Sequence, residues 1–210
     1  MQAERELRGM KAPAPGFPHR VSFEEFLATI DEETNAEWVD GEVVVMTTPT
    51  EEHARISVFL TKILSGYVMA KGLGGFVYHT EVQMKLDRSA RRPDVLYVSE
   101  ERRARFRRVY LDGAADLAIE VVSPDSRRRD RVEKLREYAR AGVREYWIVD
   151  PLQRTAEVHR LSAAGTYEQV PADYPERLVS EVLPGLWIDP AWLWSATPNE
   201  WDVYRQWGLV

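Results

Sequence analysis

Two strand-like stretches of this sequence each carry one carboxylate where the hydrophobic pattern calls for an apolar side chain. Asp94 opens "DVLYVSE", and Glu120 lies in the middle of "LAIEVVS". Pro93 cannot donate to a sheet ladder, so Asp94 is expected at the mouth of its strand. A lone charge in mid-strand costs on the order of several kcal/mol. We therefore expect Glu120 to have a compensating partner.

The side chains near Glu120 follow the alternation of a β-strand. Ala118 and Val122 share its face, whereas Ile119 and Val121 share the other face. A lysine at position 122 would have projected beside Glu120, but this position holds valine. The strand itself therefore supplies no amine to Glu120.

The segments around the two carboxylates predict the order helix, three strands, helix, strand. Apolar residues at a 3-4 spacing predict a long amphipathic helix from about Thr50 to Gly72. A second helix is expected between "SPDS" and Gly142, and "REYWIVDP" after it is expected to be a buried strand. The apolar side of this second helix should hold Val132, Leu135, Tyr138 and Ala139. The three preceding strands are expected at residues 76–86, 94–98 and 117–122.

The segments before this core predict a leader, a helix and a hairpin. Residues 1–20 are expected to be a flexible leader, and residues 21–210 one domain with a core at about 50–150. Ser22 and Glu25 form a capping-box pattern that begins a short helix. Asp40-Gly41 between two strand-like runs predicts a β-hairpin.

The C-terminal part predicts a β extension that is rich in tryptophan. The runs "TAEVHRL", "GTYEQV" and "ERLVSEVL" are expected to be edge strands, and "PGLWIDPAWLW" a closing turn with a short helix. Five of the seven Trp lie between residues 187 and 207. This density predicts either a cap over the core, which we favour, or a surface for self-association.

The composition is that of a globular protein, with 44% hydrophobic and 30% charged residues. Cysteine is absent, which excludes disulfides and thiolate metal sites, and without an apolar signal core we expect a cytoplasmic protein with no membrane partner. The net charge is −6, yet residues 88–144 hold sixteen basic against ten acidic residues. This cationic segment could attract phosphate, or its arginines could be solvated and partly neutralised by neighbouring acids.

The motifs taken together resemble one nuclease family. "PDV", "DLAIEVVSPDS" and "EKLREYARAGVREYWIVDP", preceded by "VDGEVVVMTTPTEEH", closely resemble the Uma-two family of endonucleases within the PD-(D/E)XK superfamily. The resemblance runs from about Ser22 to Trp194. It implies an α/β (α+β) fold with a restriction-endonuclease-like core of helix, three-stranded meander, helix and strand. It also implies cleavage of DNA that depends on a divalent cation, Mg²⁺ or Mn²⁺.

The resemblance assigns roles to particular residues of this chain. Asp94 matches the motif aspartate and Glu120 the motif acid, and with the carbonyl of Val121 they would hold the cation. Val122 replaces the motif lysine. Related families supply a lysine from the following helix, where Lys134 is the only one, unless it is simply a solvated helix residue.

Two further residues match family positions, each with an alternative. His53, three residues before Ile56 on the inward side of the long helix, is either a site residue or a buried, hydrogen-bonded histidine. Glu37, just before the expected hairpin turn, either enters the site or faces solvent. Glu81 and Gln83 give a weaker signal for the same pocket.

These observations favour a metal-dependent endonuclease that acts on DNA, with homodimerisation expected for cutting two strands. The missing lysine at position 122 keeps open an alternative, a non-catalytic module that binds nucleic acid or a protein partner. A glycosidase that uses Asp94 and Glu120 as acid and base ranks last, because an arginine-rich flank suits phosphate better than sugar.

Overall fold

A six-stranded sheet forms the centre of the protein in the computed structural model, which describes residues 20–30, 34–171 and 177–210. Its strand order is β11-β10-β9-β8-β6-β3. Strands β3, β6 and β8 form an antiparallel meander, and β9 pairs parallel to β8. The bounds are β3 Phe76–His79, β6 Val95–Val98, β8 Leu117–Val121, β9 Glu145–Asp150, β10 Thr155–Leu161 and β11 Tyr167–Val170.

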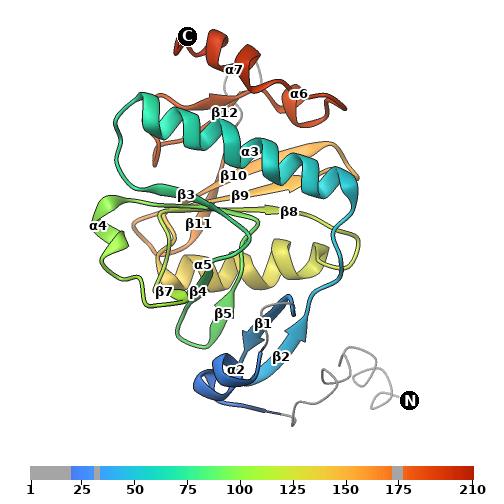
Figure 1. Cartoon of the computed structure of the whole chain (residues 1–210), viewed down its shortest axis with the longest axis vertical. Helices are drawn as coiled ribbons and strands as arrows, with labels where there is room; N and C mark the ends of the chain where they lie inside the picture. The colour runs from blue at the N-terminus through green and yellow to red at the C-terminus, as the bar shows by residue number, and fades with distance from the viewer. Residues whose placement is uncertain (1–19, 31–33, 172–176) are drawn as a thin grey trace.

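Helix α3 (Glu51–Ala70) covers one face of this sheet (Figure 1). The side chain of Thr50 accepts a hydrogen bond from the backbone of His53 and caps its first turn. Its apolar stripe packs on the odd-numbered residues of β8, namely Leu117, Ile119 and Val121. The predicted long helix and the predicted alternation along β8 are therefore confirmed.

The second helix covers the opposite face and consists of a π-helical segment, η2 (Arg129–Lys134), followed by α5 (Leu135–Ala141). Tyr138 is buried there as predicted, but Val132 is 39% exposed, so the predicted apolar side is wrong at this position. A stripe drawn at 100° per residue does not hold across a π-helix, whose wider turn rotates less per residue. The order helix, three strands, helix, strand is confirmed.

The N-terminal hairpin joins three strands from the middle of the chain in a second sheet of order β2-β1-β5-β4-β7 (Figure 1). The capping-box helix α2 (Phe23–Thr29) and the hairpin at Asp40-Gly41 are present as predicted. The hairpin packs through β1 against β5, a strand that the sequence did not predict. The bounds are β1 Ala36–Val39, β2 Glu42–Val45, β4 Gln83–Lys85, β5 Ser89–Arg91 and β7 Tyr110–Asp112, and the short helix α4 spans Glu100–Arg103.

The single strand predicted at residues 76–86 is wrong. The chain forms β3 in the six-stranded sheet, turns at Thr80, and continues as β4 in the second sheet. Thr80 has φ +24°, and its backbone N–H donates to the Asp94 carbonyl at 3.0 Å. This turn ends the pairing of β3 and redirects the chain, which alternation of apolar residues alone does not reveal.

The C-terminal segment caps α3, as favoured from the tryptophan density. Trp192 and Trp207 pack against each other, and Trp207 meets the ring of Tyr67 in α3 with centroids 5.1 Å apart. The prediction of β10 as an edge strand is wrong, because β10 lies between β9 and β11. The remaining elements are β12 Leu178–Val179, β13 Trp187–Ile188, α6 Pro190–Leu193 and α7 Glu200–Gln206.

The expected flexible leader lies almost entirely outside the described residues, which begin at Arg20. None of the helices in the described part of the chain has the length and apolar character needed to cross a membrane.

Candidate functional site

The carboxylate of Asp94 is held at the entrance of β6, next to the neighbouring strand β8. Its Oδ2 atom accepts a hydrogen bond from the backbone N–H of Val121 at 2.7 Å and lies 3.2 Å from Nε2 of His53. Both contacts use Oδ2, and Oδ1 accepts no hydrogen bond from a residue in the described ranges. Because Val121 directly follows Glu120, this hydrogen bond brings the two carboxylates into one neighbourhood.

Glu120 is only 3% exposed and shares one of its oxygens between two donors. Its Oε1 atom lies 2.8 Å from Nζ of Lys134 and accepts a hydrogen bond from the hydroxyl of Tyr138 at 2.7 Å. Burial raises the pKa of Glu120 well above its usual value, against the opposing charge of Lys134, and the nearby carboxylates of Asp130 and Asp94 raise it further. The expected partner of Glu120 is therefore present, yet the group still favours a proton or a further cation.

Lys134 lies at the centre of a buried group of charges. Its side chain is 2% exposed, and Nζ lies 3.2 Å from Oε1 of Glu37 and 3.4 Å from Oδ1 of Asp130, besides its contact with Glu120. Burial lowers the pKa of Lys134, but the three carboxylates outweigh it, so the pKa rises and the ammonium stays charged. The alternative of a solvated helix lysine is wrong.

Glu37 fixes Lys134 from the side of the N-terminal hairpin. Its Oε2 accepts a hydrogen bond from Arg91 at 2.9 Å, and its Oε1 accepts one from the backbone N–H of Arg92 at 3.1 Å. Burial raises the pKa of Glu37, but Lys134 and Arg91 outweigh it and lower the pKa to about 2. Glu37 is thus ionised and buried, which rules out the solvent-facing alternative, but it lies behind Lys134 and does not line the cavity.

The π-helical segment η2 carries both Asp130 and Lys134 into the site. The two residues are four apart, and both are buried. The backbone carbonyl of Asp130 accepts a hydrogen bond from Tyr146 of β9 at 3.0 Å, which ties this segment to the sheet. Single π-turns inside helices occur frequently at functional sites. Here the π-helical segment carries Lys134, whose amine meets Glu120 of the sheet.

His53, in the first turn of α3, completes the group from the other face of the sheet. Burial lowers the pKa of His53, but the hydrogen bond to Asp94 and the charge of its carboxylate outweigh it, so the pKa is raised. Its Nδ1 atom is buried and has no hydrogen-bond partner among the described residues. His53 is thus a mostly buried histidine in contact with Asp94, and it also lines a cavity beside Asp94, so a role in the site stays a prediction.

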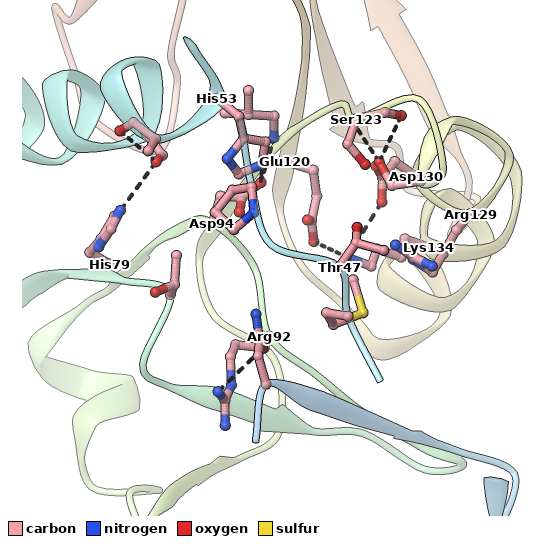
Figure 2. Close-up of a pocket in the computed structure, with 18 residues that line it drawn as sticks. Thr47, His53, His79, Arg92, Asp94, Glu120, Ser123, Arg129, Asp130 and Lys134 are labelled. Carbon is pink, nitrogen blue, oxygen red and sulfur yellow. Dashed lines mark hydrogen bonds and ion pairs between the residues drawn. The ribbon is translucent and has the colours of Figure 1, made fainter. Parts of the chain in front are cut away.

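A cavity of about 170 Å³, large enough for several water molecules, lies beside these side chains (Figure 2). Five of the residues predicted for the site line it, namely His53, Asp94, Glu120, Val121 and Lys134. Asp130, His79, Arg92 and Arg129 line it as well and were missed. Asp130 could have been predicted, because it lies four residues before Lys134 in one helix and therefore on the same side. His79, Arg92 and Arg129 could not, because only the tertiary fold brings them to the cavity. Gln83 does not line it, and its amide donates to the carbonyl of Ala36.

The oxygens left over by these contacts fit a divalent cation. Asp94 Oδ1 and Glu120 Oε2 accept no hydrogen bond within the described ranges, and hard dications prefer oxygen ligands while retaining several waters. Across residues 20–30, 34–171 and 177–210, no group of three or more histidine and carboxylate side chains is arranged to hold a metal ion. A cation here would therefore rest on two carboxylates, water and a backbone carbonyl.

Comparison with known families gives a match over residues 23–191, most of the chain, to Uma2, which is described as "Putative restriction endonuclease". The chain belongs to the Uma2 family. The chain also resembles a solved structure from Anabaena variabilis, described as a putative nuclease belonging to DUF820, with a TM-score of 0.69 and 18% identity. This alignment covers 83% of the present chain and 97% of the other, and at such identity it shows a shared fold alone. No curated protein matches.

Proposed function

We propose that this protein is a metal-dependent endonuclease that hydrolyses phosphodiester bonds of DNA at the cavity around Asp94 and Glu120. The observation that carries the proposal is the 2.8 Å distance between Nζ of Lys134 and Oε1 of Glu120. An ammonium stands beside the strand carboxylate even though the strand position for lysine holds Val122. Membership of a family whose description is "Putative restriction endonuclease" supports the same chemistry.

Asp94 and Glu120 would hold Mg²⁺ or Mn²⁺, with the carbonyl of Val121 as a third ligand. Such an ion, when bound, polarises a phosphoryl oxygen and lowers the pKa of a water molecule. The raised pKa of Glu120 supports this assignment, because burial and the neighbouring carboxylates disfavour its charged form and a bound cation would stabilise it.

The other side chains have separate roles in this proposal. Lys134 is charged and buried, so it offsets negative charge that develops on the phosphate in the transition state. His53 orients Asp94 through Nε2. Glu37 does not reach the substrate, and it keeps Lys134 protonated and in position.

A cleavage assay with plasmid DNA in Mg²⁺ or Mn²⁺ tests the proposal. Asp94→Asn and Glu120→Gln should each lower the rate about 100-fold or more, as is typical for losing one preorganised electrostatic contact. Asp202→Asn, which changes an exposed carboxylate of α7, is the matched control and should cleave like the wild type. Cleavage that survives both site substitutions would remove the assignment.

One observation favours a second candidate, a non-catalytic module that binds nucleic acid or a protein. Val122 is buried among apolar residues, so the usual lysine position is part of the core. Calorimetric titration with Mn²⁺ separates the two candidates. A nuclease should give binding heat that Asp94→Asn abolishes, whereas a degenerate site should give none that depends on Asp94.

We also infer that the protein works as a homodimer, because cutting both strands of a duplex calls for two sites. Sedimentation of the purified protein at micromolar concentration tests this. A monomer throughout would contradict the inference without affecting the cleavage chemistry.

A further inference from the structure

Most arginines of the cationic segment at residues 88–144 are neutralised within the protein. Arg91 pairs with Glu37 and Glu137, and Arg131 pairs with Asp150 and Glu157. The remaining pairs involve Arg88, Arg102, Arg103, Arg107, Arg127, Arg128 and Arg144. The alternative that this segment is partly self-neutralised is therefore correct for these arginines. It is not correct for the two arginines that line the cavity.

Arg92 is the first of these two. It lies between β5 and Asp94 and is half-buried. Its Nη1 reaches only Asn35 Oδ1, at 3.4 Å, and its Nε is buried without a hydrogen-bond partner in the described part of the chain. Burial lowers the pKa of Arg92, against the charges of Glu37 and Glu81. No described carboxylate comes within ion-pair distance of it.

Arg129 is the second and enters the cavity from the first position of η2. Its Nε is also buried without a partner, and it forms no ion pair with any described residue. Arg128 beside it points out to solvent and pairs weakly with Glu133, at 3.9 Å. Of these two neighbouring arginines, Arg128 forms an ion pair in solvent, whereas Arg129, which lines the cavity, forms none with a described residue.

Arg92, in the connection between β5 and β6, and Arg129, in η2, both line the cavity (Figure 2). The carboxylates of Asp94 and Glu120 and the amine of Lys134 line the same cavity. A guanidinium presents several N–H groups in a planar fork, which matches the paired oxygens of a phosphate group. A buried N–H group without a hydrogen-bond acceptor costs free energy. A ligand with such oxygens would accept hydrogen bonds from both guanidinium groups and remove this cost.

We propose that Arg92 and Arg129 are a phosphate-binding pair that holds the backbone of the DNA strand across the carboxylate site. This inference rests on the proposed endonuclease function and extends it. It adds two positioning residues, one before β6 and one in η2, which hold non-bridging oxygens of the DNA strand while the bond is cut. Lys134 differs from them, because its charge is already shared among three carboxylates.

Salt-dependent DNA binding tests the pair without relying on turnover. A short fluorescein-labelled duplex is titrated by anisotropy over a series of NaCl concentrations, with Ca²⁺ in place of Mg²⁺. The variants are Arg92→Gln and Arg129→Gln, and Arg205→Gln in α7 removes one positive charge far from the cavity as the matched control. Arg92→Lys keeps the positive charge but removes the planar guanidinium group with its several N–H donors. Circular dichroism and thermal melts establish that each variant is folded.

Each glutamine variant should lower the binding constant K for DNA about tenfold or more. It should also make the negative slope of log K against log[salt] shallower by about 0.9, the value for one phosphate contact on duplex DNA. Arg92→Lys should restore the slope but not the affinity. If Arg92→Gln and Arg129→Gln bind like Arg205→Gln, the phosphate-binding pair is wrong. Cleavage by the wild type, measured in parallel, would in that case leave the proposed function standing. A wild type that neither binds nor cleaves DNA would overturn both.

Discussion

Replacing Lys134 with methionine tests the electrostatic reasoning about the site, because it removes the ammonium and keeps a side chain of similar length. In the native protein Nζ lies within 4 Å of carboxylate oxygens of Glu120, Glu37 and Asp130. In the variant, the one ion pair that remains to these three buried carboxylates among the described residues is that of Arg91 with Glu37. Removing one partner of a buried ion pair typically costs about 3–5 kcal/mol.

We expect Lys134→Met to lower the free energy of unfolding by about 3–5 kcal/mol at neutral pH. The whole stability of a domain is about 5–15 kcal/mol, so the variant should remain folded but melt at a lower temperature. Urea titration followed by tryptophan fluorescence measures the change. The loss should shrink in mildly acidic buffer, because Glu120, whose pKa is already raised, then takes up a proton and removes one of the unpaired charges.

Lys62→Met is the matched control. Nζ of Lys62 lies 3.4 Å from Glu200, but its side chain is 56% exposed, so its loss should cost less than about 1 kcal/mol. If Lys134→Met cost no more than Lys62→Met, the amine would not be what stabilises the buried carboxylates, and its proposed role would fail with it.

Three other outcomes are expected. The pKa of Glu37 is about 2 against an ordinary 4.5, so its carboxylate contributes about 3 kcal/mol to the free energy of unfolding above pH 4.5. This contribution is lost as the pH falls toward 2, so the free energies of unfolding of Glu37→Gln and the wild type should converge in acid. The affinity for Mn²⁺ should rise with pH as Glu120 loses its proton, and calorimetry showing a pH-independent affinity would contradict Glu120 as a ligand. A methyl group on Gly66 would overlap the ring of Tyr204, so Gly66→Ala should lower the free energy of unfolding of the wild type by about 1–3 kcal/mol. In a Tyr204→Ala background the same substitution should lower it little, which a double-mutant cycle measures.

The sequence alone determined the order of the core elements and the two acidic positions. Periodicity separates α3 from the strands because a helix buries one face every 3.6 residues and a strand every second residue. Asp94 and Glu120 stood out because a carboxylate conflicts with the apolar pattern around it. That conflict also predicted correctly that Glu120 needs a partner, which is local information carried by a few neighbouring residues.

The tertiary structure decided which groups meet, since pairing across elements depends on how they pack. Lys134 reaches Glu120 because its helix packs on the face of the sheet that carries Glu120, and a stripe drawn at α-helical spacing misplaced Val132 because η2 is a π-helix. Glu37 reaches Lys134 only because the hairpin joins β5, a three-residue strand too short to leave a periodic pattern. Ion pairing is likewise invisible in a count of charges, because neutralisation depends on which acid comes within about 4 Å of each arginine.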